Sequence, residues 1–398
     1  MGRRDRWTAV AVAVAVAVTV GVGAGIGVGI LSILAPASVG ATSTPRARNG
    51  ALVVSPHALA VDARAGRVFT TDAVRTVHAY DAATGTPRGT IPVGDGPRGV
   101  AVDARLGRLF VADWGSTLGA KGTVTIIGEG RGRVLRTVPV GANPWAVAIA
   151  PTTGRVFVTN ANSVSVLDER TGAVMRTIPQ GGAAFTPVAI DARAGHAFAV
   201  SAYNNMFGHP IDGANTVSML DTTSGALVRT VPDLHGPIAA AVDTQTDQVF
   251  VANQDGTVAV LDGRTGAVVH TITISPRVLA NGVAVAERTR RVFVTSYDHG
   301  TFKGHVSMLD ARTGAVLATR PGGMAGAVAV AAGAGHAFVL TDRGVTMLDA
   351  ASGGALRTTV VGPSPTSIVA DAGGDHVFVA LGDGRLAVLD ARTGARLR

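Results

Sequence analysis

The chain of 398 residues contains no cysteine. It therefore forms no disulfide, holds no metal through thiolates, uses no cysteine nucleophile and carries no lipid on an N-terminal cysteine. Cysteine usage consequently leaves the redox compartment undecided. Charged residues make up only 16% of the chain, and just two of them are lysines, Lys121 and Lys303. In contrast, 47% of the residues are hydrophobic, which allows a large core and excludes a disordered chain.

The net charge of +8 does not by itself indicate nucleic-acid binding. Residues 1–48 hold five arginines and one aspartate, so half of the excess lies in this leading segment. The other arginines are scattered through turns, next to aspartates. An arginine-rich coding bias explains this distribution better than a phosphate-binding surface does, and we expect no nucleic-acid partner.

The N-terminal segment predicts export. The basic stretch Met1–Trp7 precedes Thr8–Leu34, which carries no charge. A helix of that length spans about 40 Å, more than the roughly 30 Å of bilayer hydrocarbon. Small residues follow, as at signal-peptidase sites. Residues 1–37 are thus either a cleaved signal peptide, with a mature chain starting near Ser38 or Thr42, or a retained membrane anchor. Both place the rest of the chain outside the cytoplasm.

After a linker at 38–50, the sequence repeats itself to its end, and a period of this kind decides the fold class. The clearest marker is a phenylalanine in the second predicted strand of each unit. The eight markers, spaced 40 to 52 residues apart, are Phe69, Phe110, Phe157, Phe198, Phe250, Phe293, Phe338 and Phe378.

Each unit reads as four short strands. Valine-rich alternation, as in "VSVLD", is typical of half-buried strands. The motif Asp-x-x-Thr-Gly between the third and fourth strands predicts a tight turn, in which aspartate accepts backbone N–H bonds and glycine takes the left-handed conformation. Four antiparallel strands repeated radially form a β-propeller blade. We therefore predict an all-β propeller over residues 51–398, of eight blades, with seven as the alternative.

The repeat resembles the YVTN-type β-propeller repeat of the YncE-like exported propellers. "VFVTN" (Val156–Asn160) and "VFVAN" (Val249–Asn253) carry the resemblance, with phenylalanine where the family has tyrosine, and "LDxxTG" at Leu167–Gly172 supports it. The second unit departs from the pattern, because "IIGEGRGRV" (Ile126–Val134) replaces its turn. The resemblance implies a fold and an extracytoplasmic setting, but no shared chemistry, because propellers serve many functions.

Two enzymatic alternatives find little support. "DARTG" also resembles the repeat of pyrroloquinoline-quinone enzymes, but the positions of their blade-docking tryptophan hold Arg176, Arg229, His270 and Ala318. Lactonase-type propellers bind metal through acidic residues at the channel mouth. The three glutamates, Glu129, Glu169 and Glu287, are predicted in turns on the opposite face. We therefore assign no catalytic residue, cofactor or metal ligand, although enzyme activity stays open.

Residues that the repeat does not require gather in loops on one face. The loop between the second and third strands is long in three units, at Ala112–Thr123, Ser201–Thr216 and Ser296–His305. Exposed aromatic and polar loop residues usually carry recognition energy, although these rings can also simply pack loop against loop. The candidate binding residues are Trp114, Lys121, Trp145, Tyr203, Asn204, Phe207, His209, Tyr297, Asp298, His299, Lys303 and His305.

We accordingly expect a monomeric binding or scaffold module that recognises an unknown protein or small ligand through an arc of these loops. The alternatives are a propeller enzyme, either a lactonase-like hydrolase or an oxidoreductase, with unidentified residues, and an anchored structural surface protein.

Ring closure generates the first testable prediction. Ala51–Val54 aligns with the end of a fourth strand, whereas the last unit ends early at Ala395–Arg398. We expect Ala51–Val54 to complete the last blade and thereby cover a sheet edge. Deleting residues 49–55 should lower the melting temperature measured by circular dichroism. An unchanged melting temperature would contradict this closure.

Overall fold

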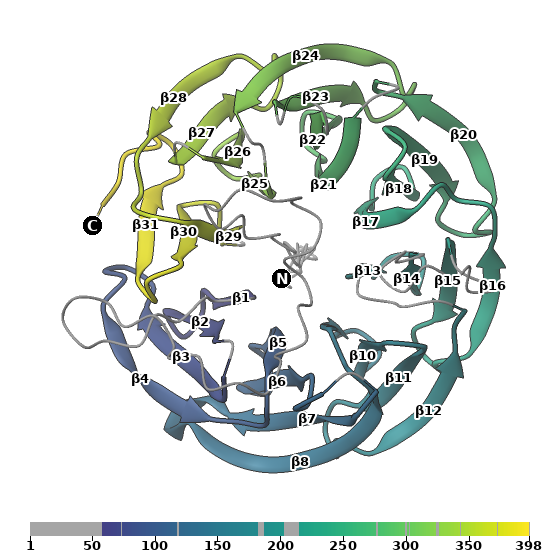
Figure 1. Ribbon diagram of the computed structural model, residues 1–398, viewed down its shortest axis with the longest axis vertical. Coiled ribbons are helices and arrows are strands. Elements are labelled where there is room, and N and C mark those ends of the chain that lie inside the picture. The colour runs from purple at the N-terminus through teal and green to yellow at the C-terminus, as the bar shows by residue number, and fades with distance from the viewer. Residues whose placement is uncertain are drawn as a thin grey trace, which may run out of the picture.

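The computed structural model describes residues 58–397, except 73, 118, 182–186, 203–214, 276–277, 299–300, 302, 324–325, 343 and 372. These residues form eight antiparallel sheets arranged radially around one axis (Figure 1). The all-β propeller is confirmed with eight blades, and the seven-bladed alternative is wrong. The predicted N-terminal signal or anchor, the linker and Ala51–Val54 lie outside the described residues.

In each blade the strands follow chain order from the axis outward (Figure 1). Blades 1 to 4 comprise β1 (Leu59–Asp62), β2 (Arg67–Thr71), β3 (Thr76–Asp81) and β4 (Pro87–Pro92); β5 (Pro97–Asp103), β6 (Arg108–Asp113), β7 (Lys121–Gly128) and β8 (Arg133–Ala142), with the 3-10 turn η2 (Glu129–Arg131) before β8; β9 (Ala146–Ala150), β10 (Arg155–Asn160), β11 (Ser163–Asp168) and β12 (Val174–Pro179); and β13 (Val188–Asp191), β14 (His196–Ser201), β15 (Thr216–Asp221) and β16 (Leu227–Val231).

Blades 5 to 8 comprise β17 (Pro237–Asp243), β18 (Gln248–Asn253), β19 (Thr257–Asp262) and β20 (Val268–Thr273); β21 (Val278–Ala286), β22 (Arg291–Asp298), β23 (Gly304–Asp310) and β24 (Val316–Gly323); β25 (Val328–Ala331), β26 (His336–Thr341), β27 (Gly344–Asp349) and β28 (Ala355–Thr359); and β29 (Pro365–Ala370), β30 (His376–Leu381) and β31 (Leu386–Asp390). The face that carries the between-blade loops and the second-to-third-strand hairpins is called the loop face, and the opposite one the turn face.

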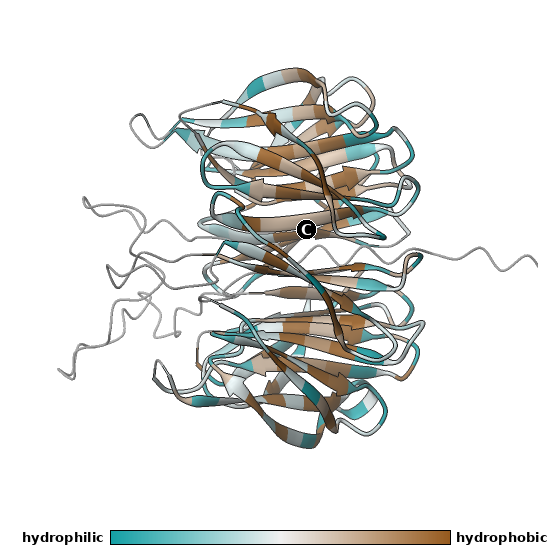
Figure 2. Ribbon diagram, turned by 90° about the vertical axis from the view of Figure 1, so that its right-hand side faces the viewer, coloured by the Kyte–Doolittle hydropathy of each residue, from teal (hydrophilic) through white to brown (hydrophobic). Residues whose placement is uncertain are grey.

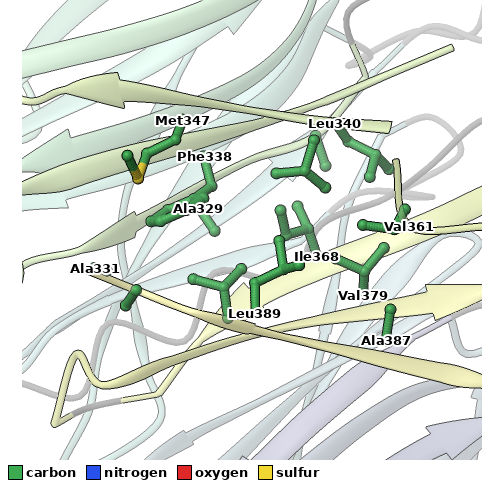
Figure 3. Close-up of a cluster of buried hydrophobic side chains, with 14 of the residues drawn as sticks. Ala329, Ala331, Phe338, Leu340, Met347, Val361, Ile368, Val379, Ala387 and Leu389 are labelled. Atoms are coloured by element: carbon green, nitrogen blue, oxygen red, sulfur yellow. The ribbon is translucent and has the colours of Figure 1, made fainter. Parts of the chain in front are cut away.

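The core lies between neighbouring blades, where side chains of adjacent sheets interdigitate. All eight marker phenylalanines are at most 1% exposed. Between blades 7 and 8, for example, Phe338 and Met347 pack with Ile368, Val379 and Leu389 (Figure 3). Hydrophobic residues accordingly run through the strands, whereas hydrophilic residues concentrate in the turns (Figure 2). A single blade has two apolar faces, so only its neighbours can bury them.

The Asp-x-x-Thr-Gly turns form as predicted. The carboxylate of Asp168 accepts hydrogen bonds from the N–H groups of Arg170 and Thr171, at 3.1 and 2.8 Å, and from the Thr171 hydroxyl at 2.8 Å. These bonds favour the charged carboxylate, and the backbone N–H of Thr171 contributes most to lowering the pKa of Asp168. Gly172 then adopts a φ of +71°, which favours glycine.

The turn glycines also dock each blade onto the one before it. A Cβ on any of them would lie within 3.0 Å of a side chain of the preceding blade, so a larger residue has no room. The contacts pair Gly172 with Ile126, Gly225 with Val166, Gly266 with Met219, Gly314 with His270, Gly353 with Met308, and Gly394 with Met347. Blade 2, whose turn departs from the pattern, instead brings Gly132 against Ile91, with 3.2 Å to a Cβ.

A second set of contacts crosses the seams in the opposite direction. The first residue of the marker strand reaches a backbone carbonyl in the third-to-fourth-strand turn of the next blade, at 2.6 to 3.3 Å. The pairs are Arg67 with Glu129, Arg108 with Glu169, Arg155 with Thr223, His196 with Gly263, Arg291 with Ala351, and His336 with Ala391. His196 and His336, to which the sequence assigned no function, therefore join blades.

The seam between blades 8 and 1 closes the ring. Tyr80 replaces the leucine of the repeat there, is 2% exposed, and donates a hydrogen bond of 2.6 Å to the Gly384 carbonyl. Tyr80 packs with Phe378 and Val388 of blade 8. On the outer edge of blade 8, Arg396 bridges to Leu389. Within residues 58–397, side-chain packing thus joins the first blade to the last. The two blades are neighbours in the ring (Figure 1).

We predict that Gly225→Ala destabilises the ring much more than Gly107→Ala. Both glycines have positive φ, so alanine costs about 1–2 kcal/mol at either position. A Cβ at Gly225 would also lie 2.8 Å from Val166, whereas nothing lies within 4 Å of one at Gly107. Overpacking should add about 1–3 kcal/mol at Gly225, measured by denaturant unfolding. Equal losses for the two variants would show that docking does not constrain the turn.

Candidate functional site

The candidate site lies at the mouth of the central channel on the loop face, where blades 2 and 3 meet. Two between-blade loops enter the inner strands there through prolines, Pro97 and Pro144. The residues before these prolines, Gly96 and Asn143, adopt φ values of +61° and +48°. Because the two loops share this conformation, the residues that follow, Arg98 and Trp145, occupy equivalent positions at the channel mouth.

Arg98 lies between two indole rings. Its guanidinium carbon is 5.7 Å from the centroid of the Trp114 ring and 5.1 Å from that of Trp145, within the range of cation–π attraction. Burial lowers the pKa of Arg98, yet a guanidinium stays charged at physiological pH. The site is therefore a positive charge framed by aromatic surface.

Close backbone contacts hold Arg98 beside Trp145. A Cβ at Gly99 would lie 2.7 Å from the Trp145 carbonyl oxygen, so only glycine lets the inner strands β5 and β9 approach this closely. From blade 1, the Thr71 hydroxyl donates a hydrogen bond of 2.9 Å to the Arg98 carbonyl. Blades 1, 2 and 3 thus all fix the position of Arg98.

Asn143 holds the hairpin loop that carries Trp114. Its side chain, with 0% exposure, donates to the carbonyls of Trp114 and Thr117, at 3.1 and 3.0 Å, and accepts from the N–H of Gly119 at 2.6 Å. The side chain of a between-blade residue therefore replaces strand pairing for the loop at 114–120. Asparagine suits this position because it also tolerates the left-handed conformation.

A buried carboxyl lies directly before Trp114. Asp113, 1% exposed at the end of β6, accepts hydrogen bonds from the hydroxyls of Thr123 and Thr125, at 3.0 and 2.6 Å. Burial raises the pKa of Asp113 to about 6, because desolvation disfavours the charged form. Its position under the surface makes Asp113 a support of the loop rather than a group that meets a ligand.

The structure brings together only some of the predicted site residues. Trp114 and Trp145 meet around Arg98, and Lys121 is exposed at the start of β7 in the same blade. Tyr297, Asp298, Lys303 and His305 belong to blade 6, on the far side of the ring from blade 2 (Figure 1). Tyr203, Asn204, Phe207, His209 and His299 lie outside the described residues. The continuous arc of loops therefore stays a prediction.

Two features of the predicted site are wrong. Trp114 is only 7% exposed, because the loop fixed by Asn143 packs it inward, so replacing it would disturb the fold as well as any binding. The long loop expected at Ser296–His305 is shorter, because strands β22 and β23 extend into it, where Tyr297 pairs with Gly304 and Leu279. Asp298, which accepts from the N–H of Thr301 at 2.7 Å, and His305 therefore belong to an extended hairpin.

Sequence reasoning missed Arg98 and Asn143. The signal for Arg98 was present, because Arg98 and Trp145 follow prolines at the same position of the repeat. The role of Asn143 depends on hydrogen bonds to a loop 24 to 29 residues away, which no local pattern predicts.

Within residues 58–397, apart from the omitted positions, no group of three histidine or acidic side chains is placed to hold a metal ion. No helix among the described residues is both long and apolar enough to cross a bilayer.

We predict that Asn143→Ala lowers the free energy of unfolding by about 2–4 kcal/mol, because it leaves two buried carbonyls and one N–H without their partner. Asn143→Gly is the matched control for the backbone, since glycine relieves the left-handed strain but restores none of the bonds. It should be less destabilising than Asn143→Ala but remain below wild type in denaturant unfolding. Wild-type stability of both variants would refute the role of the side chain.

Comparisons with known proteins agree with the fold. A family model described as outer membrane protein assembly factor BamB matches residues 302–397. The crystal structure of Saccharomyces cerevisiae Sqt1 superposes with a TM-score of 0.69 at 14% identity, covering 85% of this chain and 96% of that one. The hydrazine synthase of Kuenenia stuttgartiensis gives a TM-score of 0.59 at 14% identity, covering 89% and 100%. No curated protein sequence matches the chain. At these identities the structural likeness shows the β-propeller fold alone.

Proposed function

We propose that the protein is an exported β-propeller that works as a binding or scaffold module through its loop face. The observation that carries this proposal is the cluster of Arg98, Trp114 and Trp145 at the channel mouth. Arginine and tryptophan are enriched among residues that dominate binding energy, and a cluster already fixed in place loses little entropy on binding.

The side chains on the two faces of the ring differ in what they contact, and this difference supports the assignment. On the turn face, Arg108, Arg155 and their equivalents are occupied in joining blades. On the loop face, Arg98, Trp114 and Trp145 are bulky residues that the repeat does not require. A ligand or protein partner that presents an anionic or π-rich group at the channel mouth would suit a cation framed by indoles.

The comparisons and the N-terminal sequence favour the same class. The model of an outer membrane assembly factor covers the last blades, which is consistent with a scaffold role outside the cytoplasm. The arginine-led apolar segment at Thr8–Leu34 supports export on independent grounds. An enzyme with the same fold, a hydrazine synthase, keeps catalysis as the alternative function.

Site-directed crosslinking tests the proposal. A photo-crosslinking amino acid replaces Lys121 on the loop face or, as the matched control, Arg312 on the turn face; both residues are exposed. In the native cell envelope, we expect a discrete crosslinked complex from position 121 alone. Adding Arg98→Ala should reduce its yield at least about threefold, because it removes the central cation of the cluster.

Denaturant unfolding of the Arg98→Ala protein controls for loss of fold. The binding surface would lie away from the channel mouth if complexes formed only from position 312. The same would follow if Arg98→Ala left the yield from position 121 unchanged. Turnover of a substrate by the purified protein, abolished by the same change, would instead favour the enzyme.

A further inference from the structure

Carboxyl groups meet across the seams on the turn face. The inner strands of blades 1 and 2 end in Asp62 and Asp103, which are 2% and 3% exposed. Across the seam, each next blade contributes a glutamate from its third-to-fourth-strand turn, Glu129 in blade 2 and Glu169 in blade 3. These glutamates are 4% and 5% exposed. The chain thus contains two equivalent, buried pairs of acids.

An arginine neutralises one of the two pairs. In the seam between blades 2 and 3, the Arg105 guanidinium forms an ion pair with Glu169 and lies 3.9 Å from Asp103. Two carboxylates and one cation can all stay charged there, because attraction offsets much of the desolvation.

The other pair lacks such a cation. In the seam between blades 1 and 2, the Glu129 carboxyl interacts with that of Asp62, and its Oε1 atom is buried with no hydrogen-bond partner. Arg64 holds the repeat position of Arg105, but no ion pair among the described residues joins it to either acid. The cation facing Glu129 from β2 is Arg67, whose Nη1 donates to the Glu129 backbone carbonyl at 2.6 Å. On its own turn, the exposed Arg131 lies two residues further on.

We propose that Asp62 and Glu129 share one proton across this seam, so that the joint between blades 1 and 2 responds to pH. Two buried carboxylates in contact cannot both be charged at acceptable cost unless a cation compensates them. One shared proton satisfies both groups with a single hydrogen bond. In the seam between blades 2 and 3, the positive charge of Arg105 takes the place of that proton. This seam therefore serves as a control within the same chain.

The electrostatics agree with this geometry. Burial, followed by the bond to Asp62 and its charge, raises the pKa of Glu129 from 4.5 to about 7, while Arg67 lowers it by less. A raised pKa means that the folded protein binds a proton that the unfolded chain has released. Stability from this seam is therefore fully present below about pH 4.5 and is lost as the pH rises towards about 7.

Carbon-13 NMR of the full-length chain tests the proposal directly, because only three glutamates are present. Selective labelling at the glutamate carboxyl carbon gives three signals, and the signal absent from Glu129→Gln belongs to Glu129. We expect that signal to titrate near pH 7. In Asp62→Asn its midpoint should fall by about one pH unit or more, because the opposing charge is gone. If Glu129→Gln does not fold, Glu169→Gln and Glu287→Gln assign the signal by elimination.

Melting temperature gives a second measure. Because Asp113 and Asp191 also have raised pKa values, the difference between each variant and wild type is compared at pH 5 and pH 8. The melting temperature of wild type should decrease from pH 5 to pH 8, and in Glu129→Gln this decrease should be smaller by several degrees. Glu169→Gln should show the same decrease as wild type. A midpoint near pH 4.5, or one that Asp62→Asn leaves unchanged, would overturn the shared proton. A midpoint lowered by millimolar Ca²⁺ would also overturn it, because the pair would then hold a cation.

Discussion

The whole ring depends on one close contact, that of a turn glycine with the third or fourth strand of the preceding blade. The aspartate of the same turn accepts hydrogen bonds from the backbone N–H groups of the turn. Glycine adopts the left-handed conformation and lacks the side chain that would collide with the preceding blade. Because the contact recurs around the ring, it sets the distance between blades, and that distance decides which side chains interdigitate. The burial of the marker phenylalanines and the arrangement of side chains at the channel mouth follow from this spacing.

Much of this architecture could be predicted from the sequence, because its determinants are local and periodic. The eight phenylalanines and the Asp-x-x-Thr-Gly turns each act within a few residues, so their spacing revealed the number of blades. The candidate site was less accessible. The inward packing of Trp114 depends on Asn143 in the loop between blades 2 and 3. The role of Arg98 depends on two indoles that come from separate loops.

Seam chemistry distinguishes this chain from the repeats that it resembles. At two positions where quinoprotein repeats carry a docking tryptophan, Arg176 and Arg229 instead donate to the carbonyls of Ser224 and Thr265 in the next blade, at 2.9 and 3.4 Å. A planar guanidinium thus takes over the docking task of an indole.

Docking also has a direction, and this direction bears on how the chain folds during synthesis. Each turn glycine contacts the blade that precedes it in the chain, as Gly225 contacts Val166. A blade that leaves the ribosome therefore meets a docking partner that has already been synthesised, although the reverse contacts, such as that of Arg155 with Thr223, form only once the next blade is made. Gly85 of the first blade is the exception, because its partner Val388 is synthesised last. Until then the growing ring remains an open crescent with an uncovered apolar face at each end.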